Sequence, residues 1–346
     1  FLGYMTDKEK KHSELRLDLV SKDWVVIATS RARGKRPFEE RRIPLDDSLE
    51  KCPFETMAKQ ESPTLAYLHG EQVMLPQSGS SPKDWTTISI PNKYPAFFPQ
   101  KALKTKLVGP YSVMQGVGYH EVIVTRHHRK EIPDLPLPLV KELFDLYQKR
   151  YLEVMNVELI NHIAIFKNKG FYAGASLFHP HSQLIANPVL DPDLRRSLNG
   201  SASYYAEHAT CAHCVMLEWD LKDKKRVVFE NERMAVICPF APRGIFEMRI
   251  IPKEHSAYFE WITEEEKVAL AEAFQVALRK LKKAMRDPDY NYFLHTAPAD
   301  RQKYDHYHWH WEILPKTMNW GGFEVGTGIQ ISTIAPEEAA GILRKS

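Results

Sequence analysis

Hydrophobic and polar positions follow two different periods along this chain, and these predict helices in some segments and strands in others. Two charge-bearing amphipathic segments, at about 140–157 and 264–285, repeat their apolar residues at helical spacing. In the first segment these residues are Leu143, Leu146, Tyr147, Tyr151 and Val154. Runs rich in β-branched or aromatic residues predict strands at 121–125, 164–166, 226–230, 246–251 and 309–314. The Pro-rich stretch 133–138 and the polar stretch 191–203 are the predicted connectors.

The chain repeats part of this pattern once. Cys-Pro-Phe-Glu at 52–55 corresponds to Cys-Ala-His-Cys at 211–214, and the pair His179/His181 corresponds to His308/His310. Each half reads as strands, then a helix, then a histidine-bearing strand. This order predicts an α+β fold with two histidine-triad-like halves, 14–195 and 196–346, each an antiparallel sheet with packed helices. The division is inferred from internal similarity, which indicates a duplication.

Composition limits the class of protein. The 346 residues are 43% hydrophobic and 26% charged, which is ordinary for a globular protein with a sizeable core. A net charge of +3 does not favour a nucleic-acid partner, and no apolar run approaches the roughly 20 residues that span a bilayer. With four cysteines and no secretory signal, we expect metal-binding or reduced thiols in a cytoplasmic protein.

The segment His179-Pro180-His181-Ser182-Gln183 carries the strongest chemical signal. Side chains alternate across an extended segment, so its two histidines and its glutamine share one face. A neutral imidazole can attack phosphorus, and a backbone carbonyl on its other ring nitrogen would orient it. The alternative is a buried histidine satisfied by backbone hydrogen bonds.

This segment resembles the His-Pro-His-X-Gln active-site motif of the galactose-1-phosphate uridylyltransferase family, a branch of the histidine-triad superfamily. Further blocks resemble that family in the same order, over roughly residues 14–345. These are the opening strand and basic loop within 15–37, Asn-Lys-Tyr-Pro-Ala at 92–96, Phe-Lys-Asn-Lys-Gly at 166–170 and the Gly-rich stretch 321–328. Several blocks in order are far more specific than a lone His-Pro-His.

The resemblance implies roles for the matching residues. His181 would attack the α-phosphorus of a nucleoside diphosphate sugar, and a sugar 1-phosphate would then take the nucleotidyl group from it. Ser176 and Gln183 are expected to contact the phosphate, and Lys167 is a further candidate for phosphate or base. The residues expected to bind the remainder of the substrates are Arg33, Arg36, Asn92, Asn168, Phe323 and Glu324.

The leading interpretation is exchange of UMP between UDP-glucose and galactose 1-phosphate through uridylyl-His181. ADP-sugar phosphorylases share the same motifs, so the base, the hexose and the acceptor stay open. A nucleotide hydrolase or binding protein on the same fold is another alternative. Hydrolases of the superfamily typically carry histidine at the position of Gln183, so glutamine favours transfer to a second substrate. Relatives are often dimers with sites near subunit contacts, which makes a homodimer an expectation too.

Cysteine and histidine pairs predict metal sites, for which zinc is the expected ion. Two thiols spaced as in Cys211-x-x-Cys214 can chelate one ion, and structural zinc takes four such ligands. The repeat and the resemblance add His255 and His308 to this pair. Zinc here would brace the second half, because metal binding is often coupled to folding.

The matching set in the first half is Cys52, Glu55, His128 and His179. Many relatives carry a second cysteine in place of Glu55, so metal occupancy stays open, although a carboxylate can also ligate zinc. His127 is an alternative to His128, because aligning the halves requires a gap of one residue. His310 matches His181 in position, but Glu312 replaces the glutamine, and we expect His310 to have no catalytic role.

Overall fold

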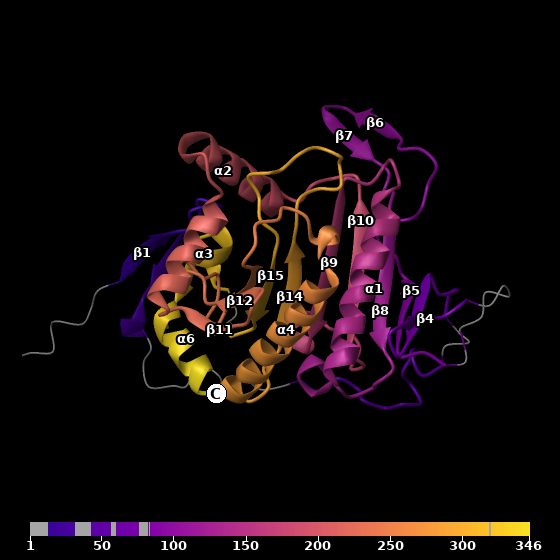
Figure 1. Ribbon diagram of the computed structural model, residues 1–346. Helices are drawn as coiled ribbons and strands as arrows, with labels where there is room; N and C mark the ends of the chain where they lie inside the picture. The colour runs from indigo at the N-terminus through magenta and orange to yellow at the C-terminus, as the bar shows by residue number, and fades with distance from the viewer. Residues whose placement is uncertain (1–12, 32–42, 57–59, 76–81, 83, 318–319) are drawn as a thin grey trace, which may run out of the picture.

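One antiparallel sheet of eleven strands runs through the molecule, and two long helices lie side by side against one of its faces (Figure 1). This computed structural model describes residues 13–31, 43–56, 60–75, 82, 84–317 and 320–346. The strands follow one another across the sheet as β11 (Val227–Glu230), β12 (Met234–Ile237), β13 (Met248–Pro252), β15 (His310–Pro315), β14 (Tyr290–His295), β9 (His162–Lys169), β10 (His181–Asn187), β8 (Tyr119–Thr125), β5 (Thr87–Pro91), β3 (Leu65–Leu68) and β4 (Glu71–Gln72). The expected α+β class is confirmed.

The long helices are α1 (Leu137–Met155) and α4 (Glu264–Met285), which confirm the two predicted helical segments. Thr263 caps α4, because its hydroxyl accepts from the Glu266 amide while the Glu266 carboxylate accepts from the Thr263 amide. A proline in the first turn of α1 occupies a position where no backbone donor is needed. The apolar faces of both helices are buried against the sheet.

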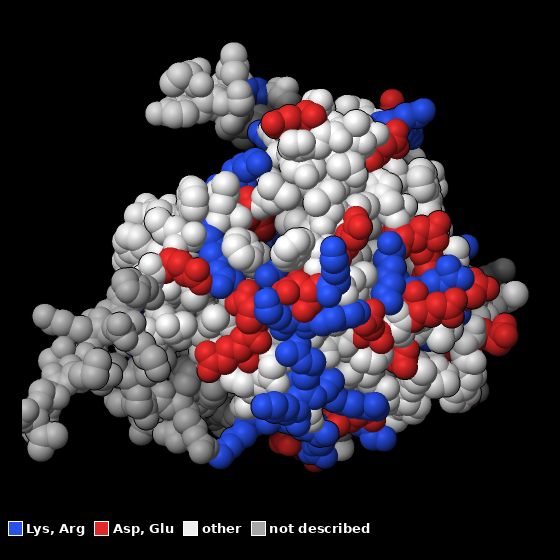
Figure 2. Space-filling view, turned by 60° about the vertical axis from the view of Figure 1, so that its left-hand side comes forward, with Lys and Arg blue, Asp and Glu red and all other residues white. Residues whose placement is uncertain are grey.

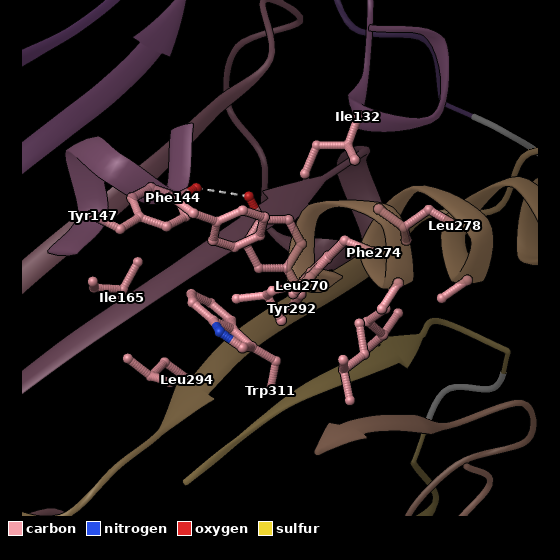
Figure 3. Packing of buried hydrophobic residues seen from close by; sticks show 14 of the residues in the cluster. Ile132, Phe144, Tyr147, Ile165, Leu270, Phe274, Leu278, Tyr292, Leu294 and Trp311 are labelled. Atoms are coloured by element: carbon pink, nitrogen blue, oxygen red, sulfur yellow. Dashed lines mark hydrogen bonds between the residues drawn. The ribbon is translucent and has the colours of Figure 1, made fainter. Parts of the chain in front are cut away.

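Trp311 of β15 packs at the centre of the core beneath both helices (Figure 3). Its ring centroid lies 5.9 Å from that of Phe144, 5.4 Å from that of Phe274 and 5.7 Å from that of Tyr292. Burying a side chain of this kind contributes roughly 1.5–3 kcal/mol. Phe144 precedes residue 195 and the other three follow it, and β9 pairs with β14, so both predicted halves share one sheet and one core.

The remaining elements surround this sheet. A second sheet has the order β1 (Glu14–Leu17), β2 (Trp24–Ile27) and β16 (Gln330–Ser332), and a hairpin joins β6 (Thr105–Val108) to β7 (Tyr111–Met114). The other α-helices are α2 (Pro192–His208), α3 (Ala212–Asp223), α5 (Gly322–Thr327) and α6 (Pro336–Lys345). Short 3-10 turns are η1 (Thr29–Arg31), η3 (Ile132–Asp134), η4 (Phe171–Ala173) and η5 (Phe259–Trp261).

Helix α2 corrects one prediction, because residues 191–203 are not a connector. The side chain of Asp191 accepts a hydrogen bond from the Leu194 amide at 2.8 Å, which caps the helix. Leu194 and Leu198 form a narrow buried stripe along α2, while the polar residues that suggested a loop lie mostly on its exposed face. The five predicted strands correspond to β8, β9, β11, β13 and β15, with ends shifted by a few residues.

Surface charge is mixed on the face that Figure 2 brings forward. Lys and Arg side chains form a band there with Asp and Glu side chains between them (Figure 2). The mixture of charges on this face agrees with the small net charge of +3. Across the described part of the chain, every helix is too short or too polar to cross a membrane.

Candidate active site and metal centres

His181 begins β10 and faces away from helices α1 and α4. Its neighbour Ser182 points to the helix side, where the hydroxyl of Tyr147 in α1 donates to it at 2.7 Å. Nδ1 of His181 lies 2.9 Å from the backbone oxygen of His179, so Nδ1 carries the proton and Nε2 keeps its lone pair. Burial lowers the pKa of His181, and the ring is therefore neutral near pH 7. This is the arrangement that a nucleophilic imidazole requires.

Gln183 lies on the same face of β10 and contacts a histidine that the sequence did not single out. Nδ1 of His120 accepts from the Ala96 amide at 3.1 Å, so Nε2 carries the proton and donates to Oε1 of Gln183 at 2.7 Å. Nδ2 of Asn92 lies 3.1 Å from the same Nε2. The amide nitrogen of Gln183 is then the donor available to a phosphate oxygen. The structure thus brings together two predicted site residues, Gln183 and Asn92, through His120.

Asn168 holds the loop that leads to His181. Its Oδ1 accepts from Asn291 at 2.8 Å, and Asn291 also donates to the backbone oxygen of Ala173. Gly170 has φ +85°, and a Cβ there would lie 1.8 Å from a carboxylate oxygen of Asp289, so only glycine fits. Ser176 lies exposed in this loop before His181. The small residues therefore allow a tight loop beside the nucleophile.

Lys167 does not reach the open face. It pairs directly with Ser182 across the strands, so both side chains point toward the helices. There Nζ of Lys167 contacts Oε2 of Glu131 at 2.5 Å, and only 5% of the Lys167 side chain is exposed. The expectation that Lys167 contacts phosphate or base is therefore wrong, and its charge instead lies beneath the nucleophile.

The first donor set consists of Cys52, Glu55, His128 and His179, whose candidate ligand atoms all lie within 4.8 Å of one another. Nε2 of His179 lies 2.8 Å from the Thr125 oxygen, and Nε2 of His128 lies 3.0 Å from the Asp47 oxygen. Both Nε2 atoms therefore donate, so both Nδ1 atoms present lone pairs toward each other at 3.2 Å. Burial lowers the pKa of His179 to about 4, which keeps its ring neutral.

Two facing lone pairs repel each other, and a cation bound between them would relieve this repulsion. Nitrogen atoms bound to one tetrahedral zinc at ~2.0–2.1 Å stand about 3.3 Å apart, close to the observed separation. Sγ of Cys52 lies 3.4 Å from Nδ1 of His179, and Oε1 of Glu55 lies 3.4 Å from Nδ1 of His128. The residues present therefore fit a metal ion. His128, and not His127, is the histidine that lies in this set, since His127 lines a different cavity.

The second donor set consists of Cys211, Cys214, His255 and His308, as expected from the spacing. Sγ of Cys214 lies 3.3 Å from Nδ1 of His255 and 3.4 Å from Nδ1 of His308. Nε2 of His255 lies 2.9 Å from the Asp305 oxygen, which turns Nδ1 toward the sulfur. Hydrogen bonds, first from Cys214, lower the pKa of Cys211 and favour the thiolate that binds metal.

Other predicted residues are not gathered at His181. Phe323 and Glu324 lie in α5, and their neighbours Trp320, Thr327 and Gly328 line a cavity in front of β15. Neither cavity that includes His179 or His181 is lined by any described residue of 320–330. Arg33 and Arg36 lie outside the described residues.

Comparisons with known proteins match the chain to families and relatives. Residues 4–191 match the family described as galactose-1-phosphate uridyl transferase, N-terminal domain, and residues 221–318 match the HIT domain. An ADP-glucose phosphorylase from Arabidopsis thaliana is 31% identical over 97% of this chain and 94% of its own. A galactose-1-phosphate uridylyltransferase from Thermotoga maritima is 27% identical over 96% of this chain and 98% of its own.

The fold comparison covers nearly the whole chain. The crystal structure of the Arabidopsis thaliana ADP-glucose phosphorylase with bound ADP-glucose has a TM-score of 0.79 and 28% identity, covering 97% of this chain and 99% of that one. The relatives are named for transfer or phosphorolysis at a sugar nucleotide, as the motifs indicated. With a family match over more than half of its length, the chain belongs to the galactose-1-phosphate uridylyltransferase family.

Proposed function

We propose that this protein is a hexose-1-phosphate nucleotidyltransferase that works through His181. Nε2 attacks the α-phosphorus of a nucleoside diphosphate hexose, an N–P bond forms, and the bond to the bridging oxygen breaks to release hexose 1-phosphate. A phosphate oxygen of the second substrate then attacks the same phosphorus and releases Nε2. The observation that carries this proposal is the neutral ring of His181, oriented by the backbone oxygen of His179.

The surrounding groups stabilise charge in both steps. The imidazole becomes positive when Nε2 bonds to phosphorus, and the His179 oxygen at Nδ1 favours that charge. The Gln183 amide and the Ser176 hydroxyl donate to the phosphate oxygens, where negative charge is spread. Asn92, Asn168, Arg33 and Arg36 bind the nucleotide and its phosphates. Glutamine at 183 also favours a second substrate over water.

There are two candidates for the donor substrate. The motifs led to UDP-glucose with galactose 1-phosphate as the acceptor. A second candidate is ADP-glucose with inorganic phosphate, which would release ADP and glucose 1-phosphate. The higher identity to the ADP-glucose phosphorylase, 31% against 27%, favours this second candidate. Both use the same His181 chemistry.

A second copy of the chain completes the site in this proposal. Phe323 and Glu324 match the family's sugar-contacting loop, yet within one chain their neighbours Trp320, Thr327 and Gly328 border the cavity in front of β15, whose described lining does not include His181. A homodimer that carries α5 to the His181 of the partner subunit would resolve this. Mixing inactive His181→Gly with inactive Glu324→Ala protein should then restore part of the activity, whereas a complete monomeric site predicts no restoration.

Zinc is the proposed ion in both donor sets, and its chemistry when bound is structural, because it would fix the strand ends that carry His179 and His308. The like placement of the two sets supports the proposed duplication into halves 14–195 and 196–346. The four cysteines form no disulfide bond in this structure, which supports a reducing compartment such as the cytoplasm.

Intact mass at mildly alkaline pH tests the central step, because a phosphoramidate is acid-labile. The protein is mixed separately with UDP-glucose and with ADP-glucose. A UMP adduct discharged by galactose 1-phosphate would identify the uridylyltransferase, and an AMP adduct discharged by inorganic phosphate the phosphorylase. His181→Gly should form neither adduct. The exposed His208→Gln on α2 is the matched control and should form adducts as the unchanged protein does.

Continued turnover by His181→Gly would refute the nucleophile. Absence of both adducts, with both nucleotides still bound, would favour a binding protein instead.

A further inference from the structure

The hairpin of β6 and β7 stands clear of the eleven-stranded sheet, at the top of Figure 1. Every residue of both strands is exposed, although Leu107 (76%), Tyr111 (71%) and Val108 (50%) are hydrophobic. A two-stranded hairpin by itself is only marginally stable in water, and clustered exposed apolar side chains mark a surface that binds something. We propose that this hairpin binds an anionic lipid surface, with its tip among the lipid headgroups.

Charge divides the hairpin into an apolar tip and a basic base. The tip, residues 107–111, reads Leu-Val-Gly-Pro-Tyr and has no charged side chain. Lys101, Lys104 and Lys106 precede the tip, and all three are exposed. A strand rises ~3.3 Å per residue, so Lys106 lies roughly 7 Å and Lys104 roughly 13 Å behind Val108. Apolar groups of interfacial proteins enter ~5–10 Å deep, a depth that would bring these ammonium groups near the lipid phosphates.

The segment that carries the hairpin is basic as a whole. Between Asp84 and Glu121 the chain has four lysines and no Asp or Glu. The full chain has a net charge of only +3, so this is a local concentration of positive charge. The negative surface of an anionic membrane attracts basic segments, and this attraction adds to the contact that the apolar tip makes.

Apolar side chains stand on both faces of the hairpin, which favours a lipid surface over a protein partner. Residues paired directly across the two strands share a face. One face carries Val108, Tyr111 and Val113, and the other carries Leu107 and Met114. A protein surface would cover one of these faces and leave the apolar residues of the other in water. Lipid headgroups would surround both.

The contact is interfacial and does not span the bilayer. Each strand has four residues, too few to cross the hydrocarbon core, and the outer backbone groups of a two-stranded hairpin need water as a partner. Water reaches the headgroup region, so these backbone groups stay satisfied there. Tyr111 suits this depth, because its ring is apolar and its hydroxyl is polar.

The hairpin lies at the end of β10 that is remote from His181. Tyr119, soon after the hairpin, pairs with Ala186, whereas His181 pairs with Val124. Five residues of β10 separate His181 from Ala186, a distance of roughly 17 Å along the strand. The hairpin can therefore bind lipid while the proposed active site stays open to its substrates, and lipid binding would hold the protein at a membrane surface.

Vesicle flotation tests this binding directly. The unchanged protein should float with phosphatidylcholine vesicles that contain about 30% phosphatidylserine, and far less with phosphatidylcholine alone. Raising NaCl from about 0.1 M to about 0.5 M should weaken the binding several-fold, because salt screens the lysines. The double variants Leu107→Ser/Tyr111→Ser and Lys104→Gln/Lys106→Gln should each bind about tenfold more weakly.

Matched substitutions on α3 control for exposed apolar and basic side chains elsewhere. Trp219, which is 61% exposed, and the exposed Lys222 offer Trp219→Ser and Lys222→Gln, which should bind vesicles as the unchanged protein does. Melting temperatures check that all variants fold. Failure of the unchanged protein to bind the phosphatidylserine vesicles would overturn the proposal, as would equal binding by the hairpin and α3 variants.

Sedimentation velocity of the lipid-free protein tests the rival occupant, a second copy of this chain. Leu107→Ser/Tyr111→Ser should sediment as the unchanged protein does. If these substitutions dissociate an oligomer, the hairpin is a subunit contact and the lipid proposal is wrong.

Discussion

The backbone oxygen of His179 lies 2.9 Å from Nδ1 of His181, while the side chain of the same His179 belongs to the first donor set. One residue thus connects the first donor set to the orientation of the proposed nucleophile. The arrangement recurs between His308, of the second donor set, and His310, where the distance is 3.1 Å. His181 is followed two residues later by Gln183, whereas His310 is followed by Glu312. The two donor sets should therefore affect activity differently.

Loss of the first metal should therefore reduce turnover more than stability. In Cys52→Ala the set loses a soft ligand, so a bound metal would fix His179 less firmly and the strand end whose carbonyl orients His181 would be less rigid. We expect a loss of about 10–100-fold in kcat. Metal content by mass spectrometry, together with kcat of the purified protein, measures both effects.

Cys214→Ala in the second set is the comparison. It should lower the melting temperature and the metal content, while the folded fraction keeps most of its kcat, because we expect His310 to have no part in transfer. Equal kcat losses in Cys52→Ala and Cys214→Ala would contradict the link between His179 and His181.

His120 should act through Gln183. If the Nε2–H of His120 is removed, Oε1 of Gln183 loses its hydrogen-bond donor at 2.7 Å. The Gln183 amide can then turn away from the phosphate. Gln183→Ala should cost about 10²–10³ in kcat, as for removal of a transition-state donor. His120→Ala should cost less, with a rise in KM for the nucleotide sugar because Asn92 also contacts His120.

Rescue separates positioning from a general structural effect. His120→Gln can still donate from its side-chain amide and should recover part of the lost kcat. If His120→Gln is as impaired as His120→Ala while both keep their melting temperatures, the hydrogen bond is not the cause. His208→Ala, on the exposed end of α2, controls for the loss of an imidazole.

The buried pair Lys167–Glu131 should couple strongly in stability. Either Lys167→Met or Glu131→Gln leaves one charge unpaired beneath β10, at an expected cost of about 3–5 kcal/mol in unfolding free energy. The double variant leaves no charge and should be far less destabilised than the sum of the single variants. Urea unfolding measures all four proteins.

Lys282 and Asp134 offer an exposed pair for comparison, with side chains 40% and 44% exposed. Lys282→Met should cost less than about 1 kcal/mol. Additive effects of Lys167→Met and Glu131→Gln would show that the buried pair is not coupled.

The sequence predicted α4 at about 264–285 from its apolar spacing, and the structure shows that Thr263 and Glu266 fix where the helix begins. It predicted both donor sets because a repeated spacing and a family resemblance pointed to the same residues. Helix α2 was missed because only Leu194 and Leu198, four residues apart, mark its buried stripe among polar residues. A narrow stripe of that kind resembles a polar connector until a partner surface is known.

The role of His120 could not be read from the chain, because it depends on strand register. His120 pairs with Ile185, and this places it diagonally beside Gln183 on the open face. The register also turned Lys167 to the helix side, against expectation. The positions of Phe323 and Glu324 depend on how α5 packs against the rest of the protein. The Gly-rich sequence of α5 has no apolar periodicity from which that packing could be predicted.

Glu260 should make stability depend on pH. It is 3% exposed, its Oε2 has no hydrogen-bond partner among the described residues, and burial raises its pKa to about 7. A carboxyl group whose pKa is raised on folding is protonated in both states below about pH 4.5 and costs nothing there. As pH rises from 4.5 through 7, the unfolded state ionises first, and the folded state loses stability.

Glu260→Gln should therefore unfold like the unchanged protein at pH 4 and be more stable at pH 8. The gain is at most about 3 kcal/mol, at 1.36 kcal/mol per pKa unit. Urea unfolding at both pH values measures the difference, and Glu158→Gln, at an exposed position, should show no such change. A stability gain of the same size at pH 4 and pH 8 would mean that packing, and not ionisation of Glu260, is responsible.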